Sequence, residues 1–192
     1  MRTILLVQPL FASKNRKHMK KAVIKYGLIS GAISASMMLI VSLTLKNIGF
    51  DKGEILGYAS MVLSFLVIYP GMIACRKQQP GEQISYLKAL WVGLLITMIS
   101  SVCYVITWVI AYHTIFPDFI DKYGAYMIDK LKQKGTPAAE INKRIAEMQQ
   151  YKEMYKNPVI MCLLTFIEPL PVGIVISLVS AFIVRTKKKS NQ

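Results

Sequence analysis

Four long apolar runs constrain this chain more than any other feature of its sequence. The runs extend from Tyr26 to Leu45, from Ile55 to Cys75, from Ala89 to Phe116 and from Val159 to Val184. About 20 helical residues, rising about 1.5 Å each, are needed to cross about 30 Å of hydrocarbon. Each run meets this length, and the sequence therefore predicts an all-α membrane protein with transmembrane helices over residues 22–45, 55–75, 89–116 and 159–184.

Composition favours a membrane protein over a soluble one. Of the 192 residues, 54% are apolar, and the mean hydropathy is positive. The net charge of +14 would favour nucleic acid as the partner of a soluble protein, but here the basic residues cluster beside the apolar runs. Lysine and arginine in such places contact anionic lipid headgroups. The lipid bilayer is therefore the predicted partner, and nucleic-acid binding is not predicted.

The two ends of the chain are expected to flank a single membrane domain, residues 19–188. Residues 1–18 contain a short apolar stretch with no small-residue cleavage site after it, so we interpret them as an N-terminal extension rather than a secretory signal. Met19 is an alternative start, and residues 189–192 form a tail. Lysine and arginine are more numerous on the side of the N-terminus, which predicts that both termini are cytoplasmic.

Small residues recur at four-residue steps in the first and fourth runs. Because small side chains let helix backbones approach closely, we expect these faces to hold a four-helix bundle together. A homodimer through the Gly27 and Gly31 face is the alternative. The candidate packing positions are Gly27, Gly31 and Ala35 in the first run and Gly173, Ser177 and Ala181 in the fourth.

Prolines interrupt two of the runs. Proline removes a backbone hydrogen bond and crowds the preceding turn, so a bend is expected at each position. In the second run, Pro70 and Gly71 are hinge candidates, although they could also mark the end of the helix. Pro169 and Pro171 are hinge candidates in the fourth run.

Residues 117–158 are too charged to enter the membrane and too apolar to be disordered. Apolar residues recur at helical spacing before Gly135 and again after Pro137. The segment is therefore predicted to form an extramembrane amphipathic helical hairpin between the third and fourth spans. Its two apolar stripes could pack only on each other, or the hairpin could dock a partner or lie on the lipid surface.

Aromatic residues support the third span. Trp91 and Trp108 are separated by about 25 Å along a helix, which is close to the spacing of the two headgroup regions where tryptophan concentrates. Both side chains are therefore expected at the membrane surfaces.

Glu168 is the one Asp, Glu, Lys or Arg well inside an apolar run. An ionised carboxylate near the middle of a bilayer is costly, and such residues often mark ion or proton paths, so Glu168 is the intramembrane functional candidate. The structural alternative is that protonated Glu168 donates a hydrogen bond to a backbone carbonyl freed by Pro169 or Pro171. Its candidate partners are His113, Tyr104 and the hydroxyls of neighbouring helices.

The sequence carries no recognisable catalytic or metal-binding motif. The sequence contains no Gly-rich phosphate loop, no HExxH and no intramembrane Ser/His pair of recognisable spacing. Cys75, Cys103 and Cys162 have no paired spacing and are expected to be buried, inert thiols. The sequence therefore predicts a protein that is not an enzyme, with no catalytic residue, no metal ligand and no cofactor.

Two functional interpretations follow from the sequence. The first is a scaffold or accessory subunit that acts through helix packing and through the hairpin, with another membrane protein or a second copy as its partner. The alternative is a small proton- or ion-coupled transporter that uses Glu168 beside a broken helix.

Several segments of the chain resemble one family of proteins. They are Met19–Gly31, Gly53–Met61, Phe116–Phe119, Tyr151–Pro158 and Pro171–Gly173. These segments resemble uncharacterised four-span membrane proteins found mainly in Bacteroidetes and catalogued as a domain of unknown function. The resemblance extends over residues 19–188 and implies an inner-membrane protein of a Gram-negative bacterium whose hairpin faces the periplasm. It carries over no catalytic or binding residue.

Overall fold

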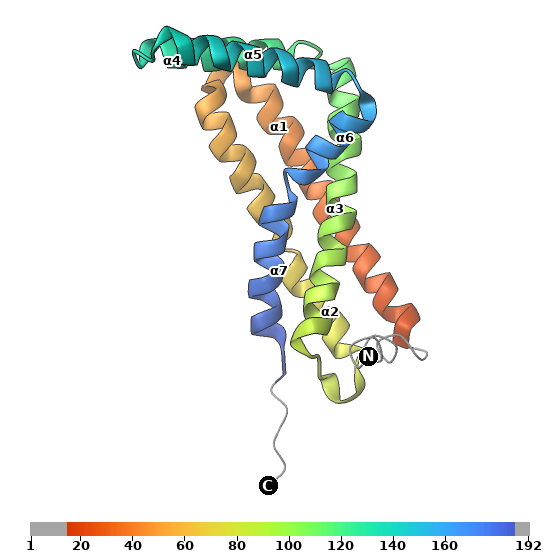
Figure 1. Ribbon diagram of the computed structural model, residues 1–192. Coiled ribbons are helices and arrows are strands. Elements are labelled where there is room, and N and C mark those ends of the chain that lie inside the picture. The colour runs from red at the N-terminus through yellow and green to blue at the C-terminus, as the bar shows by residue number, and fades with distance from the viewer. Residues whose placement is uncertain (1–14, 187–192) are drawn as a thin grey trace, which may run out of the picture.

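The computed structural model describes residues 15–186, and every regular element in this range is a helix (Figure 1). Residues 1–14 of the predicted N-terminal extension and the tail at residues 189–192 lie outside the described residues. Within that range, four helical segments are long and apolar enough to cross a membrane, and they are His18–Leu45, Asn47–Lys77, Tyr86–Thr114 and Pro158–Val184. The prediction of an all-helical chain with four such segments is confirmed, and these segments suggest a multi-pass membrane protein.

The first two spans form one element, α1 (Asn15–Phe65), which reverses direction at Gly49 (Figure 1). Gly49 has φ 76° and ψ 164°, a backbone conformation that is essentially restricted to glycine. The two limbs lie close together beside this turn, because a Cβ atom at Gly53 would lie 2.2 Å from Cδ2 of Leu45. The helix that contains the second span extends from Asn47 to Lys77, so it begins before the apolar run that starts at Ile55.

A short break separates α1 from α2 (Ile68–Lys77), which completes the second span. The break lies at Leu66 and Val67, one turn before Pro70. Proline crowds the carbonyl four residues earlier, which is that of Leu66, and this carbonyl accepts a hydrogen bond from the amide of Tyr69 at 3.2 Å instead. Pro70 itself is exposed. Gly71 is buried, and a Cβ atom there would lie 2.6 Å from Cδ1 of Ile96.

The third span is the single helix α3 (Tyr86–Thr114), which follows the short 3₁₀ helix η3 (Pro80–Glu82). The Ser85 hydroxyl caps α3 by accepting a hydrogen bond from the amide of Lys88 at 3.4 Å. Helix α3 packs against α1, α2 and α7, so it is the central helix of the bundle.

Helices α4 (Phe119–Gln133) and α5 (Ala138–Tyr155) pack against each other and lie across one end of the bundle (Figure 1). We call them the α4–α5 pair. Gly135, with φ 70°, reverses the chain between them. The opposite end of the bundle, where α1 begins and α7 ends, is called the terminal end. The two ends of the bundle therefore differ, since the terminal end carries no such transverse pair among the described residues.

The fourth span consists of α6 (Pro158–Ile167) and α7 (Leu170–Val184), and it is interrupted at Glu168 and Pro169. The side chain of Asn157 starts α6 by accepting hydrogen bonds from the amides of Val159 and Ile160 at 3.0 and 3.4 Å. The ribbon changes direction at the interruption (Figure 1). Prolines at 169 and 171 have no amide hydrogens, so this turn cannot complete its hydrogen-bond ladder.

Small residues of the first span face α3 within the same chain. A Cβ atom at Gly27 would lie 2.8 Å from Ile99, and one at Gly31 would lie 2.7 Å from Cys103. Ala35, one turn further along, is half-buried. Ser30 Oγ lies 2.9 Å from a backbone carbonyl of the second span and 3.1 Å from a hydroxyl of α3. The Gly27 and Gly31 face is therefore occupied by α3.

Small residues of the fourth span also face α3. A Cβ atom at Gly173 would lie 2.2 Å from Cγ2 of Thr97, and the Ser177 hydroxyl lies 3.4 Å from that of Thr97. Ala181 is fully buried. Both small-residue faces thus bring a helix backbone against the central helix.

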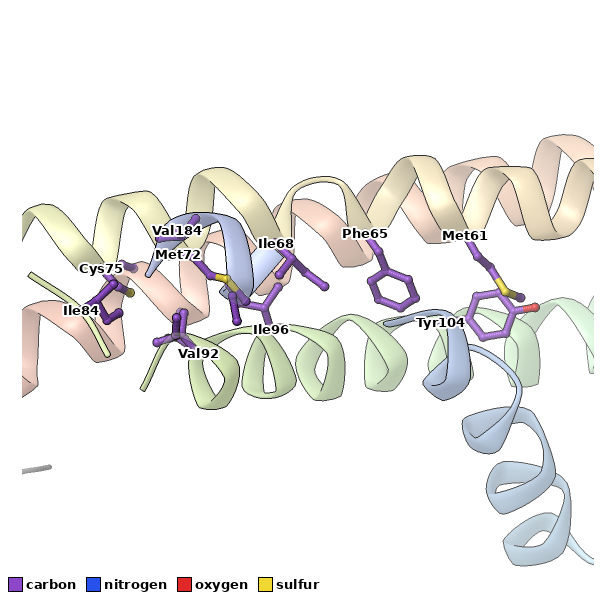
Figure 2. Packing of buried hydrophobic residues seen from close by; sticks show 14 of the residues in the cluster. Met61, Phe65, Ile68, Met72, Cys75, Ile84, Val92, Ile96, Tyr104 and Val184 are labelled. Carbon is purple, nitrogen blue, oxygen red and sulfur yellow. The ribbon is translucent and has the colours of Figure 1, made fainter. Parts of the chain in front are cut away.

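A close-packed apolar cluster fills the half of the bundle nearest the terminal end (Figure 2). Phe65, Ile68, Met72 and Ile96 are each 0% exposed, and in Figure 2 they converge from α1, α2 and α3. The same view places Tyr104 beside Met61, at the end of the cluster opposite Cys75 and Ile84. The interior is therefore sealed near the terminal end.

Candidate functional site

A cavity of about 510 Å³ lies in the half of the bundle nearest the α4–α5 pair. Its walls are the two limbs of α1 on either side of Gly49, together with Tyr104 and Trp108 of α3. The α4–α5 pair forms its roof, and Glu168 reaches it from the break in the fourth span. This volume is typical of a site for a small ligand.

Glu168 reaches the cavity because the helix is broken there. Helix α6 ends at Ile167 and α7 begins at Leu170, and Pro169 between them is fully buried, whereas Pro171 is exposed. The Glu168 side chain is exposed and lines the cavity. The sequence predicted only that this residue would lie well inside an apolar span, and the break places it at the cavity.

Tyr104 is the hydrogen-bond partner of Glu168 in the described part of the chain. Its hydroxyl donates to Oε2 of Glu168 at 3.4 Å, which is a long bond. His113, another candidate partner, is exposed and packs edge-on against Tyr112 instead. A carboxylate can accept about four hydrogen bonds, so Glu168 has acceptor capacity left for a ligand.

Aromatic side chains dominate the lining of the cavity. The Trp108 and Phe119 rings meet edge to face with centroids 5.0 Å apart, and Phe50 and Tyr123 meet in the same way at 5.6 Å. Such edge-to-face contacts are favourable and hold the rings in fixed orientations. Five tyrosines line the cavity, and they are Tyr58, Tyr104, Tyr123, Tyr151 and Tyr155.

A chain of hydrogen bonds ties three helices together beside the cavity. The indole Nε1 of Trp108 donates to the Tyr155 hydroxyl at 2.9 Å, and that hydroxyl lies 3.2 Å from Oγ1 of Thr165. Trp91 is 59% exposed, whereas Trp108 is only 8% exposed. The indole of Trp108 is a buried link between α3 and α5, and the depth of both rings in the membrane stays a prediction.

Charged residues give the cavity an acidic character. Three carboxylates line it, those of Glu54, Glu147 and Glu168, together with one guanidinium, that of Arg144. Arg144 Nη1 lies 2.8 Å from Oε2 of Glu147. Within the described residues, the lining thus has two carboxylates that no lysine or arginine of the lining neutralises, although the whole chain has a net charge of +14.

These carboxylates act electrostatically on the tyrosines of the roof. Burial raises the pKa of Tyr151, and the neighbouring Tyr155 and Glu168 add to the increase. Burial also raises the pKa of Tyr123, and the charge of Glu54 adds to that increase. Both phenols therefore remain neutral throughout the physiological range and face the cavity as uncharged rings.

Further contacts, made by residues next to the Gly49 turn, fasten the α4–α5 pair over the cavity. Phe50, next to the Gly49 turn, lies against the ring of Tyr126 with centroids 5.0 Å apart. Lys130 of α4 pairs with Asp51 of α1. The hydrogen bond between them raises the pKa of Lys130 and lowers that of Asp51, so the ion pair is formed at neutral pH. It is lost when the pH rises above the usual lysine range or falls below the usual range of an aspartate.

A comparison with protein families matches residues 25–186 of the chain to the family model described as "Protein of unknown function (DUF4199)". The chain belongs to the DUF4199 family. A search of curated proteins and a search of solved structures gave no match.

In this DUF4199 chain, Glu168 is the one cavity residue that the sequence had singled out as a functional candidate. The cavity's tyrosines come from α1, α3, α4 and α5, and no spacing in the sequence indicates that they converge. Among residues 15–186, no three His, Cys, Asp or Glu side chains come together in a way that could hold a metal ion. The groups of the cavity lining that could bind a ligand are carboxylates, phenols and aromatic faces.

Proposed function

We propose that this protein is a small transporter of the inner membrane whose cavity binds a ligand and whose Glu168 couples binding to protonation. The observation that carries the proposal is the exposure of the Glu168 carboxylate to a 510 Å³ cavity at the break between α6 and α7. Carboxylates within the membrane and broken helices near its middle are features that transporters use for coupling.

Coupling follows from thermodynamic linkage. Protonation removes the charge of Glu168 and therefore changes the electrostatic potential of the whole cavity. A ligand that prefers one protonation state stabilises that state, and protonation changes the affinity for the ligand by the same factor. No catalytic step is required, so the proposed role is non-enzymatic.

Alternating access requires that the closed side of the cavity can open. The cluster around Phe65, Ile68 and Ile96 closes the path toward the terminal end. One helix break, at Leu66 and Val67, lies within this cluster, and the fourth span is broken at Glu168 and Pro169. Broken helices of this kind absorb the changes in backbone angles that a rocking motion needs.

The proposed orientation places the terminal end in the cytoplasm and the α4–α5 pair outside the hydrocarbon on the periplasmic side. The excess of lysine and arginine near the terminal end supports it, and Lys20, Lys21, Arg76 and Lys77 lie there. With this orientation the cavity faces the periplasm.

The native thiol of Cys75 provides a test that does not require the ligand. Cys75 is 0% exposed in the sealed half, so it reacts with a maleimide only when that half opens. With Cys103 and Cys162 replaced by alanine, alkylation rates are compared between the parent chain and Glu168→Gln at each pH. Because glutamine mimics the protonated acid, we expect the two rates to agree at low pH and to separate as the pH rises.

Equal rates for both chains at every pH would show that protonation of Glu168 does not control opening, and the proposal would fail. Glu140→Gln is the matched control, because Glu140 is an exposed carboxylate of α5 that does not line the cavity. It should behave as the parent chain does. Gel filtration in detergent identifies any variant that has lost its fold.

An accessory subunit is the second candidate, and one observation favours it. Ile145 and Met154 of α5 are each 37% exposed, which offers apolar surface to a partner protein. The test is affinity purification from the native membrane in mild detergent, with and without replacement of residues 119–155 by a flexible linker. A stoichiometric partner that is lost with the linker would support this role, and the absence of any partner from the intact chain would exclude it.

A further inference from the structure

We propose that the ligand of the cavity is a lipophilic organic cation, a molecule with a quaternary or protonated centre and attached apolar groups. This inference rests on the proposed function and names the class of molecule that the cavity would take. It is drawn from the charge, the aromatic lining and the size of the cavity.

The first argument is the sign of the charge. Arg144 pairs with Glu147 at 2.8 Å, which leaves the carboxylates of Glu54 and Glu168 as the unbalanced charges of the lining. Charges at the wall of a low-dielectric cavity interact strongly with a ligand, because little water screens them. A cation entering the cavity is therefore attracted, and an anion of the same shape is repelled.

The second argument is the aromatic lining. A cation without N–H groups cannot donate a hydrogen bond, and proteins recognise it through aromatic faces and nearby carboxylates. Tyr58 and Tyr151 line the cavity and remain 49% and 38% exposed, so their rings are open to contact. Cation–π attraction grows stronger as the cation loses its water, and contact with these rings would displace water from one side of it.

The third argument is the size and the apolar body of the site. A volume of about 510 Å³ is far larger than a bare metal ion requires, and no metal-ligand cluster forms within residues 15–186. Met38, Met61 and Met148 line the cavity as well, and methionine adapts to irregular apolar shapes. The site therefore matches a cation that carries hydrophobic groups.

Binding of the cation and binding of a proton then compete for the Glu168 carboxylate. When Glu168 is protonated, the entering cation displaces the proton to solvent and pairs with the carboxylate, so one positive charge replaces another. The exchange conserves charge in the cavity and explains how a gradient of protons could drive the cation in the opposite direction.

Two probes of matched shape test the sign of the charge that the cavity prefers. Tetraphenylphosphonium and tetraphenylborate have nearly the same form and opposite charge. The chain has two tryptophans, so Trp91→Phe leaves Trp108, which lines the cavity, as the sole reporter. Trp108→Phe leaves Trp91, which lies about 25 Å away along α3 and reports only on partition into detergent. We expect saturable quenching of Trp108 by the phosphonium and not by the borate.

Two variants in the Trp91→Phe background test the residues. Glu168→Gln should raise the Kd for tetraphenylphosphonium about 30-fold, the effect of removing one partner of a buried charge pair, and should abolish proton release on binding. Tyr151→Leu, which removes one ring outside the four spans, should raise the Kd about 3- to 30-fold and leave proton release intact. Glu140→Gln should leave both unchanged.

The outcomes separate this inference from the proposed function. Borate binding as tight as phosphonium binding, or quenching equal at Trp91 and Trp108, would overturn the cation inference. If neither probe binds but Cys75 still responds to protonation of Glu168, the ligand class is wrong and the transporter proposal stands. If the phosphonium binds through Glu168 but Cys75 does not respond, the cation site stands and coupled transport fails.

Discussion

Gly49 and Gly57 lie in the same part of α1, and nothing occupies the space where a Cβ atom of either would be. They differ in backbone conformation, because Gly49 has φ 76° and Gly57 is an ordinary helical residue. A methyl group added at each position therefore separates backbone strain from crowding. Comparing the stability of the two variants measures how much the turn between the first two spans depends on a glycine at position 49.

Gly49→Ala should destabilise the protein by about 1–3 kcal/mol, because alanine is strained in this conformation. Gly57→Ala should be neutral or should stabilise it by up to about 1 kcal/mol, since alanine is the better helix former. Thermal unfolding of the two variants in the same detergent measures the difference. Equal midpoints would mean that the turn can rearrange around a side chain.

At this scale, the sequence identifies Glu168 because a single charge in an apolar run is visible without a structure. It does not identify Tyr58 or Tyr151, because a tyrosine near a span end is common and only the fold shows that these rings line one cavity. The burial of Trp108 could not be predicted for a related reason. Its distance from Trp91 indicates depth in the membrane, but it contains no information about which side of α3 faces lipid.

At the scale of elements, the packing of the bundle depends on the close contact between α7 and α3. Gly173 has no room for a side chain, because Cγ2 of Thr97 lies 2.2 Å from the position of its Cβ atom. Thr97 is β-branched and buried, so it has little freedom to move away. The two helices must therefore separate if a methyl group is added.

Gly173→Ala should destabilise the protein by about 1–3 kcal/mol through this overpacking. Thr97→Ala in the same chain should recover part of the loss, because it removes the Cγ2 and Oγ1 atoms that crowd the new methyl group. A double-mutant cycle in thermal unfolding measures the coupling. Additive effects of the two substitutions would show that crowding against Thr97 is not the cause of the lost stability.

The α4–α5 pair should loosen when its ion pair with α1 is removed. Lys130→Gln breaks the contact with Asp51 and should speed hydrogen exchange of the α4 amides. Lys156→Gln is the matched control, since Lys156 pairs with Glu153 within the same turn and holds no two elements together.

For the whole molecule, the sequence predicts the number of spans well because length and charge in a run decide whether a helix can cross a bilayer. The helix of the second span begins before Ile55, because the charges of Asp51 and Glu54 limit the apolar run but do not interrupt the helix. The cavity could not be predicted, since it exists only where four spans and the α4–α5 pair meet.

Single cysteines test the proposed orientation. In a chain without its native cysteines, Gln133→Cys at the end of α4 should react with an impermeant maleimide in cells whose outer membrane has been made permeable. Gln83→Cys, in the segment between η3 and α3, should react only after the inner membrane is broken. Both positions are exposed, so the difference reports the side of the membrane. The reverse pattern would invert the orientation and place the cavity toward the cytoplasm.

The reversal at Gly49 also has a consequence for how the protein is made. Because a single residue forms the turn, no flexible loop separates the first helix from the second while the first enters the bilayer. The first two helices must therefore leave the insertion machinery together, as a single hairpin whose limbs are already in contact at Gly53 and Leu45. A flexible insertion at this position would let the two helices enter the membrane separately. It would therefore lower the yield of inserted protein during synthesis.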